Sequence, residues 1–135
     1  MEKTYKIYLG YSWNYPDAKE RLLDFLNSSS IPFVISSLQK DDPANDRDDE
    51  EELYKAIKAQ IEPADIVIIL AGEYELYKKW VDKEIKIAKH DFSKKIIAVE
   101  LWDHDMTSET LKFNADKVIR WDHLTMLNDE IKELG

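Results

Sequence analysis

The amino-acid sequence predicts a single α/β domain whose five-stranded, mostly parallel sheet carries helices on both faces. Two observations predict this fold class. Apolar, β-branched segments alternate along the chain with segments of helical periodicity, as in right-handed βαβ units. The segment from Ile66 to Leu70 is apolar at every position, as a strand buried on both of its faces should be. With 135 residues the chain has the size of one domain, so we assign residues 1–135 to a single domain.

Five short segments rich in β-branched and aromatic residues have the length of strands. They span residues 4–9, 31–35, 65–71, 95–99 and 117–121. In open parallel sheets, ligands bind outside the carboxyl ends of the strands. We therefore expect functional side chains in the segments that follow the first four strands.

Helical periodicity predicts five helices, of which the fourth is the weakest. They span residues 17–26, 53–61, 74–88, 107–114 and 124–134. A polar, acidic run from residue 39 to 52 precedes the second helix. Carboxylates favour the positive end of a helix dipole, and Asp49 with Glu52 can form a capping box. We interpret this run as a loop that leads into a helix, because it lacks the glycine-centred pattern of a calcium loop.

Composition limits the chemistry that this chain can perform. It contains no cysteine, which excludes disulfides, thiolate nucleophiles and cysteine-ligated metal sites and is typical of a reducing cytosol. Nineteen basic against 28 acidic side chains leave a formal charge of −9, which repels a nucleic-acid backbone. The sequence shows neither an export signal nor a run of about 18 apolar residues. We therefore expect a cytoplasmic protein that binds neither nucleic acid nor membranes.

Several activities found on similar sheets lack their motifs here. The glycines lie too far apart for a dinucleotide-binding fingerprint or a P-loop, which disfavours hydride transfer and triphosphate hydrolysis. The three histidines also stand apart, so we expect no metal site. Gly10, Tyr11 and Ser12 follow the first strand in place of the acidic pair of a phosphoacceptor domain. Ser12 lacks the flanking glycines of a nucleophile elbow, which leaves ligand binding and helix capping as its two interpretations.

Glu84 is the carboxylate that does not join the charged side of the third predicted helix. A helical period places it in rows next to Trp80 and Ile87, at the edge of the apolar face, where it is partly desolvated. There it can bind ribose hydroxyls and stabilise positive charge at an anomeric carbon. Alternatively, Glu84 pairs with a lysine or marks the boundary of an amphipathic helix, and Trp80 belongs to the core. The helical pattern alone favours this structural interpretation.

Four parts of the chain resemble a known family. They include residues 8–17, at the first strand and its loop, residues 41–43 with Asp46, in the loop after the second strand, and residues 53–60, in the second helix. The most specific part is residues 66–72 followed by Tyr74, Tyr77, Lys79, Trp80, Lys83, Glu84, Ile85, Ile87 and Ala88. Together these parts resemble the TIR-like proteins of bacterial Thoeris anti-phage systems, over roughly residues 5 to 100.

The resemblance implies a flavodoxin-like TIR fold and an enzyme that cleaves the nicotinamide–ribose bond of NAD. NAD is then a substrate, and no cofactor is expected. The family's catalytic glutamate follows a tryptophan by four residues, which corresponds to Glu84 after Trp80. Gly10 departs from the pattern, because related TIR sequences commonly carry serine there. The expected substrate-binding residues are Tyr11, Ser12, Trp13, Asn14, Asp41, Asp46 and Trp80.

The family also implies partners and a biological setting. The product is linear ADP-ribose or a cyclic ADP-ribose isomer, which acts as a signal on a separate nucleotide-sensing effector. TIR domains commonly self-associate, and some require assembly before they are active. Two alternatives remain open. The chain is a non-catalytic TIR interaction module, or it is a glycosyl-transfer enzyme similar to nucleoside deoxyribosyltransferases.

Overall fold

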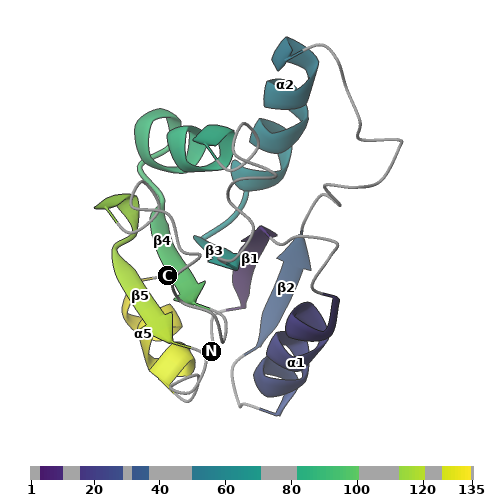
Figure 1. The fold of residues 1–135 in the computed structure, drawn as a ribbon, viewed down its shortest axis with the longest axis vertical. Coiled ribbons are helices and arrows are strands. Elements are labelled where there is room, and N and C mark those ends of the chain that lie inside the picture. The colour runs from purple at the N-terminus through teal and green to yellow at the C-terminus, as the bar shows by residue number, and fades with distance from the viewer. Residues whose placement is uncertain are drawn as a thin grey trace.

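A computed structural model of the chain describes residues 4–10, 16–28, 32–36, 50–70, 82–100, 113–120 and 126–134. Five parallel strands form one sheet in the order β2-β1-β3-β4-β5 (Figure 1). The strands are β1 (Tyr5–Gly10), β2 (Phe33–Ser36), β3 (Ile66–Leu70), β4 (Lys95–Glu100) and β5 (Lys117–Arg120). Strand order therefore reverses at β1, and β1 and β3 are interior strands with a neighbour on each side.

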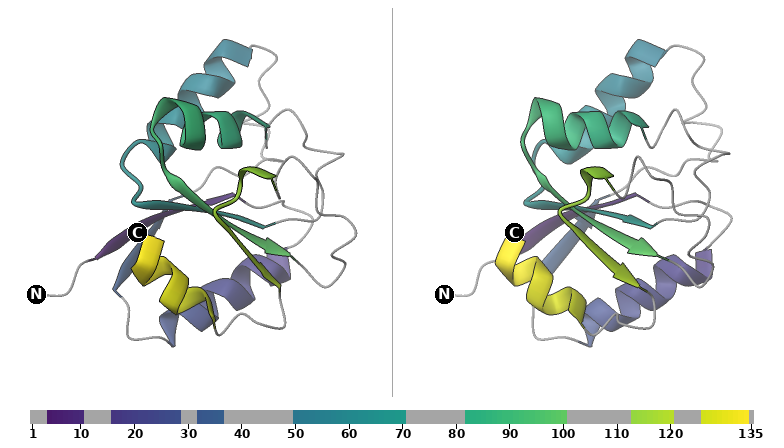
Figure 2. Two further views of the ribbon diagram at one scale, coloured as in Figure 1. Left: turned by 90° about the vertical axis from the view of Figure 1, so that its left-hand side faces the viewer. Right: turned by 60° about the vertical axis from the view of Figure 1, so that its left-hand side comes forward.

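Helices cover both faces of the sheet. Residues 82–86 form an α-helix that continues into the π-helix η2 (Ile87–Asp91). The other helices described are α1 (Pro16–Asn27), α2 (Glu50–Ile61) and α5 (Leu127–Leu134). In Figure 2, α1 and α5 lie against one face, and α2 and the helix that leads into η2 lie against the other. None of these helices combines the length and the apolar composition that crossing a membrane requires.

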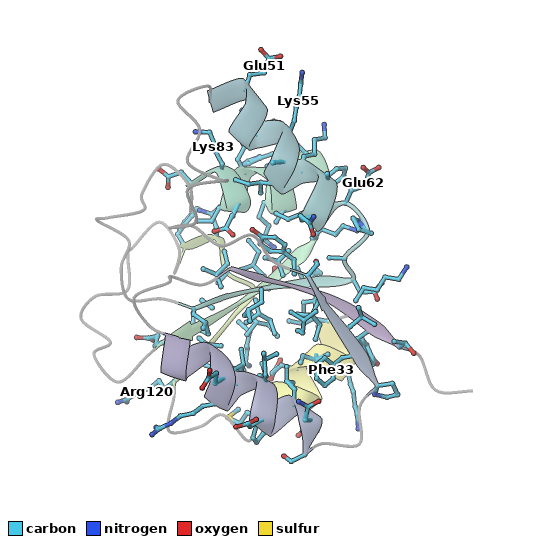
Figure 3. The ribbon with its side chains drawn as sticks, turned by 90° about the vertical axis from the view of Figure 1, so that its right-hand side faces the viewer. Phe33, Glu51, Lys55, Glu62, Lys83 and Arg120 are labelled. Atoms are coloured by element: carbon cyan, nitrogen blue, oxygen red, sulfur yellow. The ribbon has the colours of Figure 1, made fainter. Side chains whose placement is uncertain are left out.

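The core consists of two apolar layers separated by the sheet. Every residue of β3 is buried, with Val67 and Ile69 in the layer under α2 and η2, and Ile66, Ile68 and Leu70 in the layer against α1 and α5. Side chains alternate between the faces because successive residues of a strand point in opposite directions. Figure 3 shows side chains filling the space between the sheet and both helical layers.

The described elements confirm the predicted α/β fold with a parallel five-stranded sheet. Each observed strand begins and ends within two residues of its prediction. The second helix begins at Glu50, earlier than predicted, so its first turn includes acidic residues that the sequence pattern assigned to the loop. Acidic residues are favoured at this end of a helix by the helix dipole. The fifth begins at Leu127, and the start predicted for it lies outside the described residues. Of the fourth predicted helix, only residues 113 and 114 are described, and both are helical.

The third predicted helix runs past its expected end and closes with a π-turn. The backbone N–H of Phe92 donates to the carbonyl of Ile87 at 3.2 Å, which is the wider hydrogen bond of a π-helix. Ser93 follows with a φ of 54°, and the N–H of Lys94 donates to the carbonyl of Ala88 at 2.5 Å. This closure turns the chain directly into β4, so the helix that carries Glu84 is fixed to the sheet at its C-terminal end.

Candidate functional site

Glu84 lies on the helix of residues 82–86 and its side chain points down onto β1. The side chain has no exposed surface, and its Oε2 accepts a hydrogen bond of 2.5 Å from the hydroxyl of Tyr8. Tyr8 is also fully buried, within β1. An O–H···O distance of this length marks a direct hydrogen bond between the two side chains. The pair therefore joins the helix to an interior strand of the sheet.

Gly10 provides the space that the carboxylate occupies. It is the last residue of β1, two positions after Tyr8, and therefore lies on the same face of the strand. A Cβ atom at Gly10 would lie 2.7 Å from Oε2 and 3.1 Å from Oε1 of Glu84, closer than unbonded atoms normally approach. A side chain at position 10 would therefore require the Glu84 carboxylate to shift from the place that it has in this structure. Gly10, where the resemblance led us to expect serine, thus leaves room for the carboxylate in its observed place.

Burial of Glu84 is deeper than the helical pattern predicts. The pattern places it at the edge of the apolar face, whereas the structure leaves no part of it exposed. Its neighbours Ile85 and Ile87 pack in the same apolar layer as Tyr8. Burial of a carboxylate without hydrogen-bond donors is energetically costly. The hydroxyl of Tyr8, on β1, therefore helps to keep Glu84 buried at this position.

Glu100 is the second buried acid among the described residues, and the sequence pattern did not single it out. It ends β4, is 9% exposed, and follows Ile96 and Ala98 in alternation. These two residues pack in the layer that contains Tyr8, so alternation places Glu100 on the same face of the sheet as Glu84. An acid directly after an apolar strand, at the carboxyl edge of the sheet, is the signal that could have identified it.

The structure places one of the predicted site residues, Glu84. The other predicted residues lie outside the part of the chain that it describes, so their roles stay predictions. They are Tyr11, Ser12, Trp13, Asn14, Asp41, Asp46 and Trp80. The structure instead brings Tyr8 and Gly10 to Glu84, which the pattern did not identify as site residues. Only their contacts across the fold reveal them.

The surroundings of the site give no sign of a metal centre within the segments that the structure covers. They contain no group of three histidine, aspartate or glutamate side chains placed to hold a metal ion. Lys83, the residue before Glu84, projects from the helical layer on the α2 side of the sheet (Figure 3). These two neighbouring residues thus differ in burial, because Lys83 is partly exposed and Glu84 is fully buried.

Comparison with known proteins identifies a family that the chain matches and a solved structure with a similar fold. The family described as "Thoeris protein ThsB, TIR-like domain" matches residues 11–106, a range that includes Glu84 and the whole of β4. A crystal structure of a protein of unknown function from Vibrio parahaemolyticus is 13% identical, with a TM-score of 0.52 over 92% of this chain and 98% of that chain. At that identity the likeness shows the fold alone. A search of the curated proteins gives no match.

Proposed function

The chain belongs to the TIR-like domain family of the Thoeris protein ThsB, and from this premise we propose that it cleaves the nicotinamide–ribose bond of NAD in anti-phage defence. The observation that carries the proposal is the position of Glu84. Its carboxylate is fully buried and is held by Tyr8 above the last residue of β1. That is the carboxyl end of an interior strand, next to the reversal of strand order, where sheets of this kind bind nucleotides.

The reaction requires stabilisation of positive charge. The bond between C1′ of the ribose and the pyridinium nitrogen breaks, and its electron pair leaves with neutral nicotinamide. The ribose then carries oxocarbenium charge, which a fixed carboxylate in a water-poor site stabilises far better than bulk water does. Water captures the cation to give ADP-ribose and a proton, or a nucleophile of the adenosine part captures it to give a cyclic isomer.

The burial of Glu84 supports an enzyme that is silent until it is triggered. Because the side chain has no exposed surface, a ribose reaches it only after the residues that cover it move. Self-association of TIR domains is a trigger consistent with the family. We further propose a cytoplasmic location and a separate nucleotide-sensing effector as the target of the product.

The remaining contacts to NAD are proposed from the family pattern. Tyr11, Ser12, Trp13 and Asn14 directly follow Gly10, the last residue of β1, in the sequence. We propose them as contacts to the nicotinamide ribose and its pyrophosphate. Asp41, Asp46 and Trp80 complete the proposed set of substrate-binding residues.

The test is release of nicotinamide from NAD by the purified chain at high concentration, with and without lysate of infected cells. We expect Glu84→Gln to lower the rate about 100-fold or more, as loss of a preorganised electrostatic group does. Glu62→Gln is the matched control, because Glu62 is exposed beyond the end of α2, and it should release nicotinamide at the native rate (Figure 3). Circular dichroism confirms that each variant is folded.

Equal release by the native chain and Glu84→Gln would exclude Glu84 as the catalytic group. No release by the native chain under any condition would favour a non-catalytic interaction module. The complete burial of Glu84 also suits this second function, in which the carboxylate only joins the helix to β1. In that case Glu84→Gln should leave self-association unchanged when it is measured by sedimentation.

A further inference from the structure

We infer that Tyr8 is a positioning residue, which holds the Glu84 carboxylate in a fixed orientation over the carboxyl end of β1. Its effect on the reaction rests on the proposed function, whereas its hold on Glu84 can be tested without it. The inference follows from three features of the structure: the hydrogen bond, the rigidity of the strand that carries the donor, and the fit of the carboxylate against Gly10.

The hydrogen bond is direct and buried. The hydroxyl of Tyr8 lies 2.5 Å from Oε2 of Glu84, and neither side chain has exposed surface. Bonds from a hydroxyl to a carboxylate are about twice as strong as those between neutral groups. Removal of the donor would leave a buried carboxylate oxygen without this bond, which is unfavourable in an apolar layer.

The donor stands on one of the most constrained parts of the fold. Tyr8 is paired in register with Ser36 of β2 on one side and with Val67 of β3 on the other. Its ring is packed in the apolar layer with Ile57 and Ile85. Backbone ladders on both sides and packing around the ring leave the hydroxyl little freedom, so it defines a fixed point for the carboxylate.

The backbone of β1 at Gly10 limits how close the Glu84 carboxylate can come to the sheet. The carboxyl carbon of Glu84 would lie 3.2 Å from a Cβ at this position, and both oxygens would lie nearer. The carboxylate therefore rests directly on the backbone of β1 while Tyr8 holds one of its oxygens. Preorganised groups of this kind stabilise charge in a transition state because they need not reorient as the charge forms.

The kinetic test compares Tyr8→Phe with Tyr5→Phe under the conditions that give native release of nicotinamide. Phenylalanine keeps the ring and removes only the hydroxyl. Tyr5 begins the same strand and packs against the opposite layer, so it is the matched control. We expect Tyr8→Phe to lower kcat about 10-fold to 100-fold, with KM changed less than about threefold and rates normalised to folded protein. Tyr5→Phe should retain the native kcat.

A double variant separates positioning from a general loss of stability. If Tyr8 acts through Glu84, Tyr8→Phe should lower the rate no further when Glu84 is already glutamine. A purely structural tyrosine would change the folded fraction but leave the normalised kcat at the native value. A native kcat for Tyr8→Phe, or an equal loss for Tyr5→Phe, would overturn the positioning role.

A spectroscopic test does not depend on activity or on the folding of Tyr8→Phe. In tyrosine-labelled native protein, a buried hydroxyl that donates to a carboxylate should give a downfield, slowly exchanging proton resonance. We expect this resonance to shift in Glu84→Gln and to remain in place in Tyr5→Phe. If the resonance is absent, or if it does not shift in Glu84→Gln, then Tyr8 does not hold Glu84 and the inference is wrong. If the resonance behaves as expected but the native chain releases no nicotinamide, the hold stands and the proposed function fails.

Discussion

Glu84, Tyr8 and Gly10 illustrate at the scale of single residues how one buried carboxylate constrains two positions on a neighbouring strand. Tyr8 donates to Oε2, and Gly10 has no side chain where the carboxylate lies. Gly10 has an ordinary extended backbone within β1, so the reason for glycine at this position is space and not conformation. The effect of a side chain at position 10 on stability should therefore depend on Glu84.

We predict that Gly10→Ala destabilises the native chain by about 1–3 kcal/mol, because the added Cβ displaces the Glu84 carboxylate and weakens its bond to Tyr8. The measurement is urea denaturation. In a Glu84→Ala background the space is vacant, and the same substitution should be neutral or should stabilise by up to about 1 kcal/mol, since alanine reduces the entropy of the unfolded chain. The same loss in both backgrounds would show that the carboxylate is not what Gly10 accommodates.

At the scale of elements, Asp116 joins η2, β4 and the start of β5. Its Oδ2 accepts hydrogen bonds from the N–H of Ile96, at 2.8 Å, and from the ammonium of Lys89. Lys95 lies 4.0 Å from the other oxygen. Burial alone would raise the pKa of Asp116, but the bonds from Lys89 and Ile96 and the charges of both lysines outweigh it, so the pKa is lowered.

This direction predicts how the stability depends on pH. A lowered folded pKa means that the contribution of Asp116 is complete above the unfolded value of 3.8 and is lost as the pH falls through the folded pKa. We therefore expect Asp116→Asn to lower the free energy of unfolding by about 1 kcal/mol at pH 7 and by less in acid. Urea denaturation of both proteins at several pH values measures the difference.

The control for this prediction is Asp24→Asn, at an exposed position of α1. It should change the free energy of unfolding by less than about 0.5 kcal/mol. A loss for Asp116→Asn that stays constant from pH 7 into acid would mean that the side chain contributes through packing and not through its charge.

At the scale of the whole molecule, the sheet couples two apolar layers. Ile131 of α5 is fully buried against one face, in the layer that also contains Ile119 and Leu22. Each strand contributes side chains to both layers, because successive side chains point to opposite faces of the sheet. Loss of packing on one face should therefore weaken the other face equally, through global unfolding.

We predict that Ile131→Ala lowers the free energy of unfolding by about 2–5 kcal/mol, as buried truncations do. Native-state hydrogen exchange should show equal losses for the slowest amides of α1 and of α2, although α2 lies on the far face of the sheet (Figure 2). Lys132→Ala, at the exposed neighbouring position, should have little effect. Loss of protection in α1 and α5 alone would show that the two layers unfold independently.

The sequence by itself determined the class of fold and singled out Glu84 as a candidate for the functional site. Strand and helix periods are local properties, so the described elements lie close to their predicted positions. Glu84 stood out because it departs from the charged side of its own helix, which is also visible within a few turns of sequence. The family match over residues 11–106 agrees with the resemblance carried by the same segments.

Only the tertiary structure decided how Glu84 is held. The crossing of its helix over β1 brings Tyr8 and Gly10 beneath the carboxylate, and neither position has a local pattern that indicates this contact. The burial of Glu100 likewise depends on what packs around the end of β4. Periodicity reports which side of an element a residue occupies. Which residue of another element meets it there depends on strand order and helix placement, which are set by packing across the whole domain.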